Sequence, residues 1–145
     1  MPFPDLPLYF ENAAGQLREH PAGYAVLHYT SGPRQPGTFA EFGTQVGRLL
    51  LARQWHRLLS DQRELSILSD AEKEWVTTQW LPQHVARPAV LHEALLVARD
   101  VFARLAIGQA LNQTSATTGT ITLHYCADEA AAHTYLLGLG TSLPG

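Results

Sequence analysis

The side chains best suited to chemistry in this sequence are its seven histidines and its single cysteine. Two of them, His124 and Cys126, stand two residues apart, with Asp128 just beyond. On a strand this spacing places both on one face, where they would reach one metal ion or pair as a nucleophile and its base. The same spacing also suits ordinary packing beside a helix start. Because the sequence holds no HxxxH or HExxH motif, we prefer packing and predict no metal, no cofactor and no catalytic residue.

A second polar group, Asp61, Arg63 and Glu64, follows a predicted strand. In α/β proteins the space beyond the carboxyl ends of the strands is the usual place for a ligand. The group therefore has two interpretations, a solvated loop in which one carboxylate caps a turn, or the rim of a binding site. The full predicted rim for a partner consists of Asp61, Arg63, Glu64, Ser66, Ser69 and Trp80.

Two of the tryptophans, Trp75 and Trp80, stand five positions apart on a predicted helix. Five residues advance an α-helix by about 500°, so the two side chains should lie about 140° apart around its axis. We expect Trp75 to anchor the core and Trp80 to lie at the edge of the buried face or in solvent. An exposed tryptophan often marks an interface.

Composition narrows the function classes further. The net charge is −3 and lysine occurs once, with no basic stripe, so nucleic acid is not expected as a partner. One cysteine excludes an internal disulfide and fits a reducing compartment. The sequence shows no signal peptide and no apolar run near the roughly 20 residues of a membrane span, which favours a cytoplasmic protein. It also lacks GxGxxG, P-loop and GxSxG motifs, so no enzyme class is indicated.

The elements that must position these residues are short strands alternating with helices. Strands are predicted at 8–11, 16–20, 24–29, 55–60, 93–98 and 120–126. Helices are predicted at about 39–53, from 69 with a kink at Pro82, at 101–111, and from 128 to about 137, where Gly138 and Gly140 end the last one. Thr38 with Glu41, and Ser69 with Glu72, match the capping-box pattern, and 112–119 reads as a loop.

This order, β-β-β-α-β-α-β-α-β-α, predicts an α/β fold with a mixed sheet whose central strands are parallel. Residues 1–7 contain three prolines and are expected to form an extended or frayed lead-in. Residues 8–140 then form a single domain, and 141–145 form a tail.

Three segments, 55–61, 69–75 and 79–82, together resemble small bacterial STAS-like proteins of the SpoIIAA-like branch. In that family a strand ending in Asp precedes a helix that carries a Trp and a Trp-aliphatic-Pro step. The likeness extends over roughly residues 8–137. It implies a switch module that binds partner proteins, sometimes under the control of a serine phosphorylated at a helix start. This sequence departs from the family there, because the stretch 61–70 has no glycine and offers only Ser66 and Ser69.

These observations favour a non-catalytic protein-interaction module, possible roles being bacterial signalling or regulation. The alternative is a small-ligand or lipid-binding carrier of the Sec14-like type, to which STAS-like folds are also similar. A homodimer is expected, formed through the N-terminal hairpin or the region of Trp80.

Overall fold

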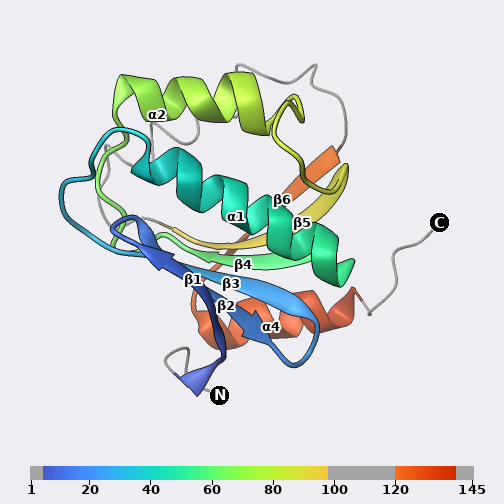
Figure 1. Cartoon of the computed structure of the whole chain (residues 1–145). Coiled ribbons are helices and arrows are strands. Elements are labelled where there is room, and N and C mark those ends of the chain that lie inside the picture. Colours follow the sequence, from blue (N-terminus) through green and yellow to red (C-terminus); the bar gives the residue numbers. More distant parts are fainter. Residues whose placement is uncertain (1–4, 98–119, 140–145) are drawn as a thin grey trace.

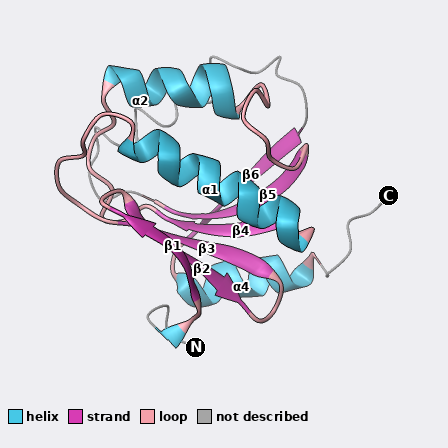
Figure 2. Ribbon diagram, in the orientation of Figure 1, coloured by secondary structure: helices cyan, strands magenta, loops and turns pink. Residues whose placement is uncertain are grey.

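The computed structural model describes residues 5–97 and 120–139. One sheet of six strands carries helices on both of its faces (Figure 1, Figure 2). The elements are β1 (Leu8–Asn12), β2 (Gly15–His20), β3 (Tyr24–Tyr29), α1 (Thr38–Arg53), β4 (Arg57–Asp61), α2 (Asp70–Trp75), the π-helix η2 (Val76–Trp80), β5 (Val90–Leu96), β6 (Thr120–Cys126) and α4 (Glu129–Gly138). The predicted α/β fold with a mixed sheet is confirmed.

The strands lie in the sheet in chain order, from β1 to β6. The pairs β1–β2 and β2–β3 are antiparallel, whereas β3, β4, β5 and β6 run parallel. Each connection between parallel strands thus steps in the same direction across the sheet. Since such crossovers are right-handed, α1 and α2 lie on the same face, and α4 covers the opposite face (Figure 1).

The pleat of the strands divides the core into two layers. On the α1 face Leu27, Leu58 and Leu91 pack beneath the helix, and on the α4 face Val26 and Leu59 pack against α4. All five residues of β4 are buried, as expected for a parallel strand covered on both faces. Among the described residues, no helix combines the length and apolar character that crossing a membrane requires.

Residues 5–7, the described part of the expected lead-in, are not frayed, and residues 1–4 lie outside the described residues. Leu6 is buried in the core layer beneath α4. Its carbonyl accepts a hydrogen bond of 2.8 Å from Arg18, and the Pro7 carbonyl accepts one of 3.0 Å from the Glu19 amide. Docking to β2 therefore orders this segment, which prolines alone would leave extended.

Among the described residues, α2 and α4 begin with the caps predicted from the sequence, and α1 does not. Ser69 and Glu72 form the predicted capping box, and Asp128 caps α4 by accepting a hydrogen bond of 2.8 Å from the Ala131 amide. The capping box at Thr38 is wrong, because α1 begins one residue earlier, with Gly37 as its N-cap at φ 86°. Glycine adopts this left-handed conformation without strain, and because it has no side chain, no side chain caps α1.

Strand and helix ends shift by a few residues elsewhere. β4 begins at Arg57, two residues later than predicted, and β5 begins at Val90, three earlier, because it pairs with β4 from Arg57 opposite His92 onwards. α4 ends at Gly138, as expected, with Leu139 as a right-handed C-cap. The predicted helix at 101–111, the loop at 112–119 and Gly140 lie outside the described residues.

The helix after Ser69 changes character before it reaches Pro82. The hydroxyl groups of Thr77 and Thr78 both donate to the Glu74 carbonyl, at 3.1 and 2.7 Å. From Val76 the chain continues as a π-helix, in which the Leu81 amide donates to the Val76 carbonyl at 2.9 Å. The helix ends at Trp80, and the chain turns at Pro82.

Candidate functional site

A cavity of about 80 Å³ lies between the sheet and the helices α1, α2 and η2; we call it the inner cavity. Among the described residues its walls are aliphatic side chains from the strands and α1, and four aromatic rings, Tyr29, Phe39, Trp75 and Trp80. All but Phe39 are half-buried, although the strands and helices that carry them are packed together. Small-molecule sites have the same mostly apolar lining with few polar groups, but the inner cavity is smaller than their usual volume of roughly 300–1,000 Å³.

The aromatic rings pack against one another at one end of the inner cavity. Trp75 and Trp80 stack with ring centres 6.1 Å apart, and Phe39 meets Trp75 edge-on at 6.1 Å. The π-helix brings Trp80 beside Trp75, because its i→i+5 bonding places residues five apart on one side. The predicted separation of 140° is therefore wrong, and neither ring is fully buried or fully exposed. Trp75 lines the cavity instead of anchoring the core.

Helix α1 makes room for this arrangement with a glycine. A Cβ atom at Gly43 would meet the ring of Trp75. The absence of a side chain at Gly43 therefore lets the outer edge of the Trp75 ring approach α1 closely. A larger residue at this position would displace the ring.

The floor of the inner cavity is polar. Ser60 on β4, Gln62 just after it, and Glu93 on β5 project toward the same face of the sheet. The Gln62 amide donates to the Ser60 hydroxyl oxygen at 3.2 Å, and the Ser60 hydroxyl bonds the Glu93 carboxylate. Because Ser60 already accepts from Gln62, its own proton is free to donate to Glu93. The donors therefore run in one direction and end on the carboxyl group.

The carboxyl group of Glu93 lies in an environment that disfavours its charge. Burial raises the pKa of Glu93 to about 7, against which the hydrogen bond from Ser60 has a smaller, lowering effect. Burial, followed by the nearby charge of Glu93, also raises the pKa of the Tyr29 phenol. Near neutral pH Glu93 is therefore ionised in part of the molecules and is able to accept or donate a hydrogen bond.

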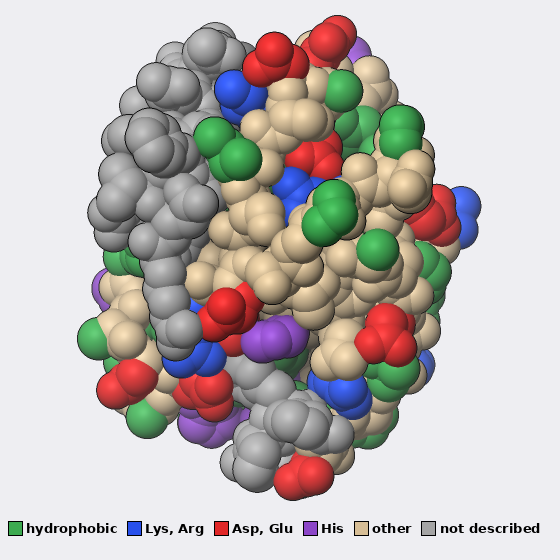
Figure 3. All heavy atoms as spheres, turned by 90° about the vertical axis from the view of Figure 1, so that its left-hand side faces the viewer, with side chains coloured by type: hydrophobic (Ala, Val, Ile, Leu, Met, Phe, Trp, Pro, Cys, Tyr) green, Lys and Arg blue, Asp and Glu red, His purple; other side chains and the backbone are tan. Residues whose placement is uncertain are grey.

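A second hollow of about 790 Å³ opens beside the cavity, between residues 32–37 and 66–72; we call it the outer groove. It lies where the β3–α1 and β4–α2 connections meet, on the side of the molecule shown in Figure 3. On that side acidic and basic side chains are interspersed with apolar ones (Figure 3). Phe39 and Trp75 line both the outer groove and the inner cavity, so the two hollows share a wall.

An ion pair fixes one side of the outer groove. Arg34 donates to both carboxylate oxygens of Glu72, at 2.7 and 2.8 Å, and its guanidinium lies 5.8 Å from the centre of the Phe39 ring. Burial alone would raise the pKa of Glu72, but the hydrogen bonds from Arg34 and from the Ser69 amide outweigh it, and the pKa is lowered. The pair joins the two connections that form the groove.

The predicted rim residues do not form one surface. Ser66 and Ser69 line the outer groove, Glu64 is exposed, and Trp80 lines the inner cavity. Ser66 accepts a hydrogen bond of 3.0 Å from the Gly32 amide, and Ser69 caps α2. Both serines therefore have structural roles at the groove.

Asp61 and Arg63 lie on the opposite, α4 face of the sheet. Asp61 is 1% exposed and accepts from His28 at 3.0 Å and from Arg63 at 2.9 Å, while Arg63 also donates to Glu129 at 2.9 Å. Burial acts to raise the pKa of Asp61, yet the hydrogen bonds from His28 and Arg63 hold it well below its usual range. The predicted turn cap is confirmed, because the Asp61 carboxylate accepts a hydrogen bond of 3.2 Å from the Arg63 amide, but the predicted solvation is wrong for Asp61, which is buried and ties β3 and α4 to the end of β4.

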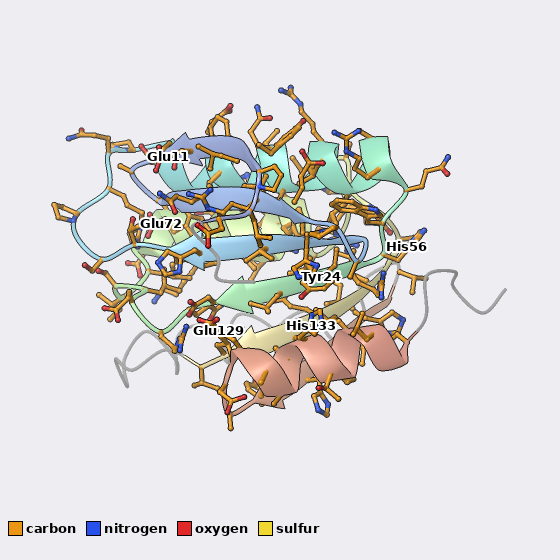
Figure 4. The ribbon with its side chains drawn as sticks, turned by 90° about the horizontal axis from the view of Figure 1, so that it is seen from below. Glu11, Tyr24, His56, Glu72, Glu129 and His133 are labelled. Carbon is orange, nitrogen blue, oxygen red and sulfur yellow. The ribbon has the colours of Figure 1, made fainter. Side chains whose placement is uncertain are left out.

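Further polar contacts join α4 to the sheet. The Tyr24 hydroxyl and His133 lie 2.6 Å apart and point toward one another across the interface (Figure 4). Arg57 is buried and donates to the Leu136 carbonyl at 2.8 Å and to the Ala22 carbonyl at 2.7 Å. These groups are used in packing α4.

His124 and Cys126 share a face of β6, as predicted, but make separate contacts. The His124 ring stacks on Tyr135 at 4.0 Å, and the Cys126 thiol contacts the His124 carbonyl at 3.6 Å. Burial raises the pKa of the Cys126 thiol, opposite to what an activated nucleophile needs. Within residues 5–97 and 120–139, no three His, Cys, Asp or Glu side chains are grouped so as to hold a metal.

Sequence reasoning missed the polar floor of the cavity. One signal was present: the charged residue Glu93 stands directly before the apolar residues Ala94 to Leu96, in a strand that lies between two other strands. A charge at the centre of a buried strand is rare unless it is paired or functional. Tyr29 carried no comparable signal, because an aromatic residue at a strand end is common.

No family model matches the chain, and neither the curated proteins nor the solved structures contain a match to it.

Proposed function

We propose that this protein is a non-catalytic binding module that takes a small, largely apolar ligand into the inner cavity. The observation that carries the proposal is a hollow whose described lining residues include four aromatic rings and, at its floor, one carboxyl group. The inner cavity holds about 80 Å³ and is partly open, so it is accessible from outside. A genuinely apolar cavity of about 150 Å³ is known to bind benzene. The inner cavity therefore suits a short alkyl chain or a small ring, and is too small for a whole lipid.

Tryptophan fluorescence offers a direct test, because Trp75 and Trp80 line the cavity. Titration with n-butanol should change the emission and saturate. Leu123→Phe, which adds volume to a cavity wall, should remove the response. Leu51→Phe is the matched control, since Leu51 lies on α1 and is 45% exposed. An identical response in all three proteins would contradict binding in the inner cavity.

A protein-interaction module is the second candidate, and the outer groove is the observation that favours it. Its volume of about 790 Å³ lies within the roughly 300–1,000 Å³ of typical ligand sites. Ile67 lines this groove and is 53% exposed, so it offers an apolar contact to a partner. We expect a short apolar segment of a partner protein as the occupant.

The groove is tested by comparing proteins captured from a bacterial lysate by three forms of the chain. A true groove partner should be captured by the wild type and by Leu51→Glu, and lost with Ile67→Glu. Both substitutions place a charge at an exposed apolar position, so they match in chemistry. A partner that all three forms retain binds elsewhere.

A further inference from the structure

We propose that the inner cavity selects a small organic ammonium ion, which Glu93 binds through its carboxylate while the aromatic rings enclose the cation. This inference rests on the proposed function, because it names the ligand class of the same cavity. It is carried by three features: the acceptors left open on Glu93, the aromatic walls, and the lack of a competing cation among the described lining residues.

The carboxylate of Glu93 has more acceptor capacity than its neighbours use. An ionised carboxylate offers about four lone-pair positions. The Ser60 hydroxyl fills one of them, and Gln62 is committed to Ser60 at 3.2 Å. Glu93 itself is half-buried on a strand flanked by β4 and β6, and it lines the inner cavity. A ligand with several N–H donors would complete its hydrogen bonding.

The walls of the cavity favour a positive charge at this position. The faces of aromatic rings carry negative potential and attract cations at up to about 6 Å. Two of the lining rings already attract a cation. Arg34 lies 5.8 Å from the centre of the Phe39 ring, and Arg87 lies 5.4 Å from the centre of the Trp80 ring. An ammonium group near Glu93 would have Tyr29 and the tryptophan pair as its further neighbours.

Among the described residues that line the cavity, none carries a positive charge that could pair with Glu93. Among the described lining residues, the titratable groups are Glu93 on β5 and Tyr29 on β3, whereas α1, α2, η2 and β6 contribute uncharged side chains. Arg34 is paired with Glu72, and Arg87 donates to the carbonyls of Trp80, Leu81 and Pro88. An ammonium ion would therefore supply the missing counter-charge, and a ligand carboxylate would be repelled.

Protonation of Glu93 should control this binding. Burial raises the pKa of Glu93 to about 7, so the empty site is mostly neutral at pH 6 and mostly ionised at pH 8. The ionised fraction changes about tenfold over that interval. Ammonium binding should strengthen by about tenfold from pH 6 to pH 8, and below pH 7 it should release a proton from Glu93 into solution.

The test is calorimetric titration of the full chain with n-butylammonium, n-butanol and butyrate at pH 6 and pH 8. The three probes share a four-carbon chain and differ in the end group. We expect n-butylammonium to bind at least tenfold more tightly than n-butanol at pH 8, and butyrate not to bind. Glu93→Gln keeps the shape and removes the charge, so it should abolish both the ammonium preference and its pH dependence while n-butanol still binds. Glu74→Gln, an exposed glutamate on α2, should behave as the wild type.

The outcomes separate the two proposals. If n-butanol binds but n-butylammonium binds no more tightly, the ammonium inference is wrong and the cavity remains a binding site. If none of the three probes binds, the proposed function is wrong as well. Should Glu93→Gln fail to fold, the comparison of the three probes at two pH values in the wild type decides the question.

Discussion

The ionisation of Glu93 sets how the stability of the protein depends on pH. Its pKa is about 7 in the folded chain and 4.5 when unperturbed, so the folded protein binds this proton more tightly. The resulting stability is complete below pH 4.5 and is lost as the pH rises through about 7. Between pH 5 and pH 8 the wild type should lose about 2–3 kcal/mol of unfolding free energy relative to Glu93→Gln.

Urea melts of both proteins at several pH values measure this difference. Glu74→Gln controls for the loss of one carboxylate at an exposed position. A wild-type curve that stays parallel to that of Glu93→Gln across the range would mean that Glu93 is ionised throughout.

The stability that Asp61 contributes has the opposite dependence on pH to that of Glu93. Burial acts to raise its pKa, but the hydrogen bonds from His28 and Arg63 lower it below its unfolded value. The stability that it contributes is therefore present above the unfolded pKa of 3.8 and is lost as the pH falls. Asp61→Asn should cost about 3 kcal/mol at pH 7, because it leaves a buried, partly unpaired site. The deficit should shrink at pH 3, as seen in urea melts, and Asp70→Asn at an exposed aspartate should show little change at either pH.

At the scale of elements, the sequence predicts those features that depend on local pattern. The continuous apolar run of β3 and the alternation in β6 gave both strands their observed bounds, and Ser69 and Asp128 marked two helix starts. The π-helix was not predicted, because the pattern was interpreted with the 3.6-residue period of an α-helix, whereas Val76–Trp80 has i→i+5 bonding. That single change in helix type moved Trp80 beside Trp75 and placed it in the cavity.

A second feature of the elements is the close contact that α1 makes with the turn before β5. Gly47 lies on α1, and a Cβ atom there would meet the carbonyl oxygen of Ala86, which is backbone and unable to swing aside. In an open helix, glycine to alanine stabilises by up to about 1 kcal/mol. Gly47→Ala should instead destabilise by about 2 kcal/mol, since overpacking must shift the helix or the turn.

Thermal melts give the sign of this effect directly. Gly138→Ala on α4 is the matched control, because nothing lies within 4 Å of a Cβ atom at that glycine. The control should be unchanged or slightly raised in melting temperature. If Gly47→Ala melts with or above it, α1 has more freedom against the turn than the contact implies.

At the scale of the whole molecule, the alternation of strands and helices predicted the class of fold but not which polar residues would meet. The predicted rim treated Asp61 and Ser66 as neighbours along the chain. The sheet separates them, since Asp61 faces α4 and Ser66 lies at the outer groove. Conversely, Tyr29 and Glu93 are 64 positions apart and meet in one cavity, which only the sheet order brings about.

The edge of the sheet at β1 leads to a prediction about assembly. Among the described residues β1 pairs with β2 alone, and Leu8 and Tyr9 on it are 47% and 38% exposed. Unpaired edges with apolar side chains tend to be covered by another chain, and closed two-fold dimers are the commonest way. We predict a homodimer at micromolar concentration through this edge. Trp80, the alternative contact, lines the inner cavity and is half-buried, so the β1 edge is the contact that we test.

Light scattering after size exclusion measures the mass that decides this. The wild type should elute with the mass of two chains, and Tyr9→Lys should elute with the mass of one, because an edge lysine opposes pairing. Leu51→Lys, at an exposed position on α1, should leave the dimer intact. The register shift between Leu8 and Phe10 bends this edge, so pairing would begin after it, at Phe10 to Asn12. A mass of one chain for the wild type at the highest concentration would mean that this bend already protects the edge, and that Leu8 and Tyr9 do not meet a second copy.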